Sequence, residues 1–76
     1  MSALPGIQAI LIDIKDVTLI TIIGKSTVKV LEDAGQFPKR ISINNSKVVW
    51  RYADVRGWCE LVSELGKYPP EKYYRL

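Results

Sequence analysis

The feature that most limits how this chain can fold is the lack of residues for a disulfide or a Cys/His metal site: its 76 residues contain one cysteine, Cys59, and no histidine. A domain of this size buries only about 60% of the surface that its unfolded chain exposes, and small domains often add disulfides or a structural metal. An intramolecular disulfide, a zinc finger and a Cys/His nucleophile pair are all excluded here. The fold must therefore rest on an apolar core, and the single cysteine favours a reducing, cytoplasmic location.

The composition agrees with one small globular domain. Apolar residues make up 47% of the chain and charged residues 25%, which is ordinary for globular proteins. A chain of this length is too short for two domains of the usual size. No apolar run approaches the roughly 18 residues that a membrane span needs, so we expect no membrane association.

The net charge of +3 is unevenly distributed. Residues 25–56 contain seven Lys and Arg residues and only three Asp and Glu residues, and no acidic residue occurs between Asp33 and Asp54. This concentration is typical of a protein that binds a polyanion, because each cation placed on a phosphate releases counterions. The alternative is that these cations only keep a loop and a hairpin in solution.

Two short helices are predicted in the first half of the chain. Asp13 precedes apolar residues spaced by threes, and Asp16 lies in the first turn, where a carboxylate interacts favourably with the helix dipole. The series breaks at residues 21–24, resumes, and ends before Gly35, which is suited to close a helix, while Pro38 prevents its continuation. The apolar positions of the two series are Ile14, Val17, Ile20, Val28, Leu31 and Ala34. These positions predict a helix-turn-helix unit with one buried side.

A β-hairpin is predicted next. Residues 40–43 and 48–51 are rich in β-branched and aromatic side chains, and the segment between them contains two asparagines, which tolerate the left-handed conformation of hairpin turns. A hairpin alone is barely stable in water, so we expect Ile41, Ile43 and Trp50 to turn toward the helices.

A third helix is predicted over residues 52–65 and ended by Gly66, with an apolar stripe at Val55, Trp58, Leu61, Val62 and Leu65. Both tryptophans are expected in the core and Cys59 at its boundary. Residues 67–76 contain two prolines and no periodicity, which predicts an extended or flexible tail. Residues 7–12 are compatible with a short strand before the first helix.

The order helix, turn, helix, hairpin, helix defines the expected fold class. It is a mainly α protein with a small β-hairpin, a winged helix-turn-helix domain over residues 1–66, followed by the tail 67–76. Such domains present one helix to the DNA major groove and the hairpin to the backbone beside it.

Several short motifs occur in a familiar order. They are the runs 14–17, 24–28 and 34–39, followed by Trp50-Arg51 and by Asp54-Val55 with Trp58. Together they resemble the AlpA-like family of small phage and mobile-element regulators, which are excisionase-type winged-helix proteins, and the resemblance covers Leu11 to Leu61. It implies an excisionase/MerR-like fold, binding to double-stranded DNA, and a role in excision, in regulation of an integrase gene, or in both.

The same resemblance implies which residues contact DNA. The family's helix start, which meets bases and phosphates, falls on Lys25, Ser26, Thr27 and Lys29. The chain departs from the family at several positions: an arginine falls on Val30, the apolar or basic residues after it fall on Glu32 and Asp33, the turn glycine falls on Ile22, and the capping serine falls on Gly24. Isoleucine is poorly suited to a positive φ at such a turn.

Elementary physics supports a compatible arrangement. If the second helix buries its apolar side, Lys25 and Lys29 share an outward line with Glu32 and Asp33, so the helix is positive at its start, where its dipole also favours phosphate. The remaining candidate DNA contacts are Lys39, Arg40, Lys47 and Arg51, in the predicted wing and its flanks. The alternatives are that Lys29 and Asp33 form an ordinary surface pair and that Lys47 only solubilises a turn.

Three classes of function compete. The first is a DNA-binding excisionase or regulator of phage origin, located with the nucleoid, in which copies associate cooperatively on DNA and redirect an integrase. The second is a protein-binding regulator that inhibits an integrase, a response regulator or a polymerase subunit. An enzyme is the weakest, because no histidine base, paired carboxylates or phosphate-binding glycine motif is present. We expect no cofactor and no metal.

Overall fold

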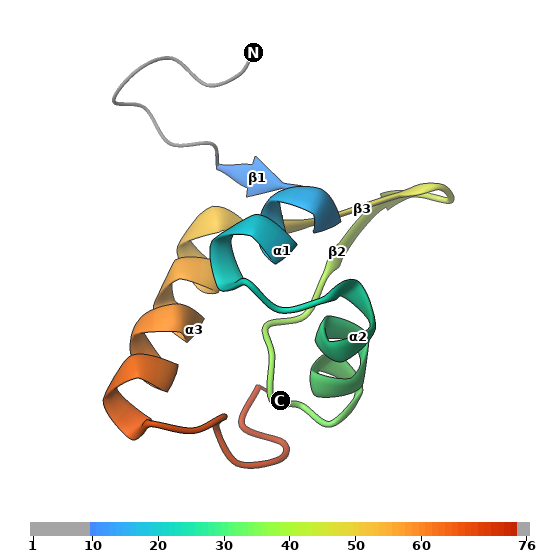
Figure 1. Ribbon diagram of the computed structural model, residues 1–76. Helices are drawn as coiled ribbons and strands as arrows, with labels where there is room; N and C mark the ends of the chain where they lie inside the picture. The colour runs from blue at the N-terminus through green and yellow to red at the C-terminus, as the bar shows by residue number, and fades with distance from the viewer. Residues whose placement is uncertain (1–9, 75–76) are drawn as a thin grey trace, which may run out of the picture.

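The computed structural model describes residues 10–74 and shows three helices and a three-stranded antiparallel sheet (Figure 1). In chain order, the elements are β1 (Leu11–Ile12), α1 (Ile14–Thr21), α2 (Lys25–Asp33), β2 (Ile41–Asn44), β3 (Lys47–Arg51) and α3 (Tyr52–Leu65). The strands lie in the order β1-β3-β2, so the hairpin is joined by one short N-terminal strand. This is a small winged helix-like domain, as the sequence predicted.

The helices begin and end where local signals indicated. Asp13 has an extended backbone, and its carboxylate accepts the N–H of Asp16 at 3.0 Å, which caps α1. Gly35 and Gly66 adopt left-handed conformations after α2 and α3, with φ of 76° and 71°. The turn between α1 and α2 contains the same conformation at Ile22, with φ 62°, which is costly for a β-branched residue.

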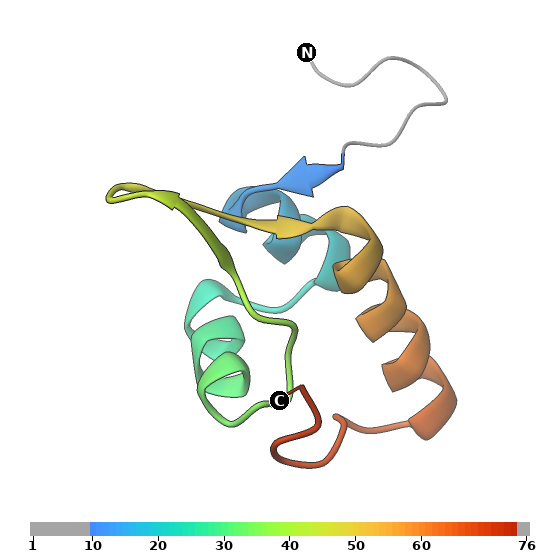
Figure 2. The ribbon, with the colours of Figure 1, turned by 180° about the vertical axis from the view of Figure 1, so that it is seen from behind.

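The sheet is antiparallel throughout. β1 pairs with β3 through Leu11 opposite Arg51 and Ile12 opposite Trp50, which gives the short strand considered for residues 7–12; residues 7–9 lie outside the described residues. β2 pairs with the other edge of β3, and the register shifts between Ser42 and Asn44. The hairpin then extends beyond the helices as a wing (Figure 2).

The core lies where the three helices meet β1 and β3. Its buried members are Ile12, Val17, Val28, Leu31, Phe37, Trp50, Val55 and Trp58. The indole N–H groups of the two tryptophans donate to the carbonyl oxygens of Pro38 and Gln36, at 3.2 and 2.7 Å, so both rings are buried without an unpaired donor. The prediction that both tryptophans belong to the core is confirmed.

One prediction about the hairpin is wrong. Ile41 and Ile43 were expected to face the helices, yet they are 36% and 54% exposed. Val49, next to Trp50 on β3, is buried instead. The reason is that β2 runs along the outer edge of the sheet and out into the wing, where the helix layer no longer covers it.

The segment after α3 also differs from expectation. Residues 68–74 turn back to the exit of α2 instead of extending away: the N–H groups of Lys72 and Tyr74 donate to the carbonyls of Ala34 and Gly35 at 2.8 and 2.9 Å. Pro69 is fully buried, and its carbonyl accepts from the side chain of Gln36. We call residues 68–74 the C-terminal strap. It covers the core near Trp58, so it is part of the packed structure.

Candidate nucleic-acid interface

Helix α2 presents a polar surface at its N-terminal half. Its inner side is fixed by Val28 and Leu31, which are 0% and 4% exposed. The four predicted recognition residues, Lys25, Ser26, Thr27 and Lys29, are all exposed. Gly24 precedes them with an extended backbone and no side chain to cap the helix. The first two turns therefore expose two cations and two hydroxyls, and the helix start adds the positive end of the helix dipole.

The wing lies on the same side of the molecule as α2, away from α3 (Figures 1 and 2). Its turn is closed by Asn44, whose side-chain oxygen accepts the N–H of Ser46 at 2.9 Å. Lys47 follows this turn as the first residue of β3 and is exposed, as is Arg51 at the other end of the strand. The wing and the start of α2 thus both offer cations on one side of the domain.

Lys47 also acts on the start of α1. The N–H of Asp16 lowers the pKa of the Asp13 carboxyl, and the charges of Lys47 and Lys15 act in the same direction. Asp13 therefore stays ionised near neutral pH. Lys47, which follows the turn of the wing, therefore lies within electrostatic reach of the start of α1.

Arg40 is held by the protein itself. Glu32 accepts its backbone N–H at 2.6 Å and its Nε at 2.8 Å, and the guanidinium lies 5.0 Å from the centre of the Trp50 ring. The Glu32 side chain is only 8% exposed. The expectation that Glu32 shares the outward line of Lys25 is therefore wrong, because the carboxylate turns toward the loop after α2 to pair with Arg40.

Lys29 forms the surface pair that the sequence offered as an alternative. Its Nζ lies 3.3 Å from Oδ1 of Asp33, and both side chains are more than 60% exposed. Such a pair contributes little to stability and leaves Lys29 accessible. Lys39, the last flank residue, is exposed beside the pocket described next.

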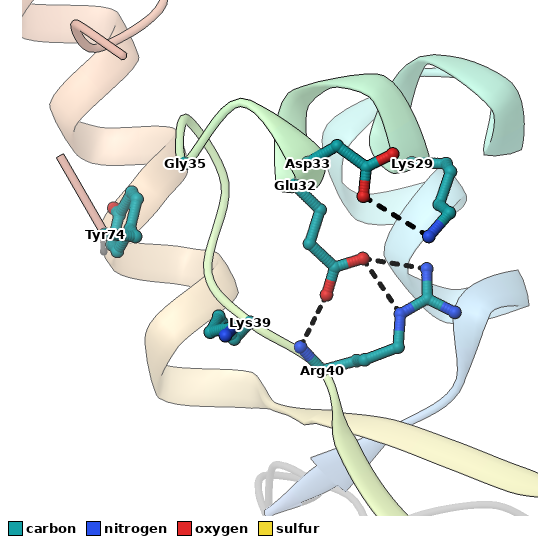
Figure 3. Close-up of a pocket in the computed structure, with 7 residues that line it drawn as sticks. All are labelled: Lys29, Glu32, Asp33, Gly35, Lys39, Arg40 and Tyr74. Carbon is teal, nitrogen blue, oxygen red and sulfur yellow. Dashed lines mark hydrogen bonds and ion pairs between the residues drawn. The ribbon is translucent and has the colours of Figure 1, made fainter. Parts of the chain in front are cut away.

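A pocket of about 300 Å³ lies at the exit of α2 (Figure 3), lined by Lys29, Glu32, Asp33, Gly35, Lys39, Arg40 and Tyr74. Its two carboxylates pair with two of its three cations. The pair between Glu32 and Arg40 connects α2 to the loop that follows it, and the residues that line the pocket include no nucleophile with an adjacent base. The sequence did not reveal the contribution of Tyr74, because the tail lacks a periodic signal.

Other chemistries find little support in the residues that the structure describes. Within residues 10–74, no three His, Cys, Asp or Glu side chains are grouped so that they could hold a metal ion. Burial raises the pKa of the Cys59 thiol, with the charge of Glu60 adding to the effect, so the thiol stays protonated. None of the helices in that part of the chain is long and apolar enough to span a bilayer.

Fold and surface together define a winged helix-like domain that exposes a basic helix start beside a basic wing. A family model described as prophage CP4-57 regulatory protein (AlpA) matches residues 11–63, from β1 almost to the end of α3. The chain belongs to this family of phage regulatory proteins. No match was found among curated proteins or among solved structures. The family is one of regulators rather than enzymes, and a regulatory family of this kind is expected to bind DNA.

Proposed function

We propose that this protein binds double-stranded DNA sequence-specifically, with α2 in the major groove and the wing on the adjacent backbone. The observation that carries the proposal is the N-terminal half of α2, whose two lysines and two hydroxyl residues are exposed while its opposite side is buried. Recognition of the major groove requires a helix that packs on its domain through one side and exposes polar side chains on the other. The family match supports the same role.

The residues divide into three roles. Lys25 and Lys29 neutralise phosphates, while Ser26 and Thr27 meet base edges near the helix start. Lys47, Arg51 and Lys39 contact the backbone from the wing and the loop before it. Arg40 contributes least to DNA directly, because Glu32 occupies its Nε and one Nη; its role is to fix the orientation of α2.

We further propose that the regulation is exerted at a recombination junction. A single module of this kind buries only about 600 to 1,000 Å² on DNA, so one copy binds modestly, and adjacent copies gain by filling neighbouring sites together. Several copies bend the DNA between them. Such an assembly directs an integrase toward excision and represses or activates genes that overlap the same sites.

A mobility-shift titration at two salt concentrations tests the binding. The probes are duplexes from the DNA flanking the gene and a random duplex of equal length. We expect the affinity for the flanking DNA to be higher and to fall steeply with salt, Lys25→Ala to reduce the salt slope by about one, and Thr27→Ala to change the preference among sequences.

Lys67→Ala serves as the matched control. It removes the same charge from an exposed position just after α3, whose C-terminal end lies away from the wing and α2 (Figure 1), and should leave the salt slope unchanged. An affinity that does not respond to salt, or that is equal for the flanking and random duplexes, would contradict the proposal. Footprinting on the flanking DNA then gives the repeat spacing, and a single isolated site would refute the cooperative assembly.

A further inference from the structure

Val30 is an apolar side chain in the middle of a polar surface. It lies on the exposed side of α2, one turn after Ser26 and Thr27, and is 64% exposed. The inner side of the helix is supplied by Val28 and Leu31. Val30 therefore sits among the residues to which we assign DNA contacts.

Folding does not account for a valine at this position. β-branched residues form helices less readily than alanine, lysine or glutamate, because the preceding turn restricts χ1. An exposed side chain also gains little from leaving water. Leu19 and Ile22 are exposed to an even greater extent, so the place of Val30 beside the proposed base-contacting residues, rather than its exposure, makes it a candidate for a contact with DNA.

The chemistry around Val30 indicates what it would contact. Helical spacing places the hydroxyls of Ser26 and Thr27 one turn before it and the carboxylate of Asp33 one turn after it, and Lys29 precedes it in the sequence. In the major groove, the C5-methyl group of thymine is the apolar feature that distinguishes one base from the others, and apolar side chains read it by contact. A helix rises about 1.5 Å per residue, so Val30 lies about 6 Å further along than Ser26, which is about two base-pair steps.

We propose that Val30 determines specificity for thymine by packing against its C5-methyl group. The inference rests on the proposed function and deepens it. Val30 reads one thymine by shape, while Ser26 and Thr27 read neighbouring base edges and the lysines hold the phosphates. The chain therefore prefers sites with a thymine at one fixed distance from the bases that the start of α2 contacts.

Uracil substitution tests this directly, because uracil keeps every hydrogen-bonding group of thymine and lacks only the methyl group. In the footprinted duplex, each thymine is replaced by uracil in turn and the affinity is measured by fluorescence anisotropy. We expect one position at which uracil weakens binding by the wild-type protein about fourfold, as loss of one methyl contact implies. In Val30→Ala, the same substitution should have no further effect.

Two controls separate the possible outcomes. Val30→Ala should keep the salt slope and a thermal midpoint at least as high as that of the wild type, since alanine is the better helix former. Lys25→Ala should lose part of its salt slope and keep the uracil effect. Salt-dependent binding with no uracil effect at any thymine, or an effect that persists in Val30→Ala, would overturn the inference alone. Absence of salt-dependent binding would overturn the proposed function as well.

Discussion

The two ends of α2 differ in how they are held. At the C-terminal end, Glu32 binds Arg40 from the next loop, and the strap donates two backbone hydrogen bonds to Ala34 and Gly35. At the N-terminal end, Gly24 supplies no cap, and the residues from Lys25 to Thr27 are exposed. The polar contacts of α2 with the rest of the domain are therefore concentrated at its C-terminal end, and the residues predicted to contact DNA at its start stay exposed.

The acidic and basic residues of α2 are also separated between its two ends. The acids of α2 lie in its last three residues, and each is paired with a cation, Glu32 with Arg40 and Asp33 with Lys29. Lysines and hydroxyls occupy the first turns. A polyanion approaching along the positive end of the helix dipole therefore meets no acid from α2 in the first two turns.

The largest effect is expected where the strap meets α2. A Cβ on Gly35 would lie 2.7 Å from the backbone Cα of Lys72, and the positive φ of Gly35 disfavours any side chain. We expect Gly35→Ala to lower the free energy of unfolding by about 3 kcal/mol, from backbone strain together with loss of the strap's hydrogen bonds. Denaturation in urea measures this change.

Gly57→Ala is the matched control for Gly35→Ala. Gly57 lies within α3, and a Cβ there would meet no atom within 4 Å. Because alanine favours a helix over glycine, this variant should gain about 0.5–1 kcal/mol. Similar behaviour of the two variants would show that the strap does not constrain the end of α2.

The second effect concerns the buried ion pair at the same end. Glu32→Ala removes the carboxylate that accepts the N–H and the guanidinium of Arg40, so we expect a loss of about 2 kcal/mol. Asp33→Ala, on the same helix, removes an exposed carboxylate whose pair with Lys29 spans 3.3 Å and should cost less than about 0.5 kcal/mol. Equal losses in urea denaturation would mean that Arg40 does not anchor α2.

The sequence was informative where the signal is local. Asp13, Gly35 and Gly66 marked helix boundaries that the structure confirms, because capping depends on residues within one turn. The strap was not predicted because its contacts join segments that are distant in sequence. The sequence around Gly35 also did not indicate that this glycine packs against the strap. The inward direction expected for Ile41 and Ile43 was wrong because alternation along a strand does not reveal where the covering helices end.

The candidate site, like the fold, could be predicted from the sequence only in part. Exposure of Lys25, Ser26 and Thr27 followed from helical periodicity once the buried side was known. The position of Glu32 did not, because a carboxylate near the edge of the buried side can turn to solvent or to a partner, and its partner Arg40 lies in a loop. Contact of any of these residues with DNA stays a prediction until binding is measured.

The third effect lies at the less constrained end, in the turn that leads into α2. Ile22 has a φ of 62° and is 89% exposed, so its backbone is strained and its side chain gains little from packing. We expect Ile22→Gly to raise the free energy of unfolding by about 1 kcal/mol, because glycine adopts this conformation without steric cost. Ile22→Ala keeps a Cβ and should gain much less. A lower thermal midpoint for Ile22→Gly would show that the isoleucine side chain supports the fold.

The smallest effect separates the starts of α1 and α2 by their response to acid. The folded-state pKa of Asp13 is lowered chiefly by the N–H of Asp16, so its carboxylate contributes stability that is fully present above its unfolded pKa of about 4 and is lost as the pH falls through the folded value. Asp13→Asn keeps a capping oxygen that does not titrate, so the wild type should lose about 0.3–1 kcal/mol more than this variant between pH 6 and pH 2. Hydrogen exchange should place the loss in the first turn of α1, since Gly24 gives the start of α2 no comparable group to titrate. The same acid response in Asp13→Asn as in the wild type would mean that the start of α1 does not depend on this charge.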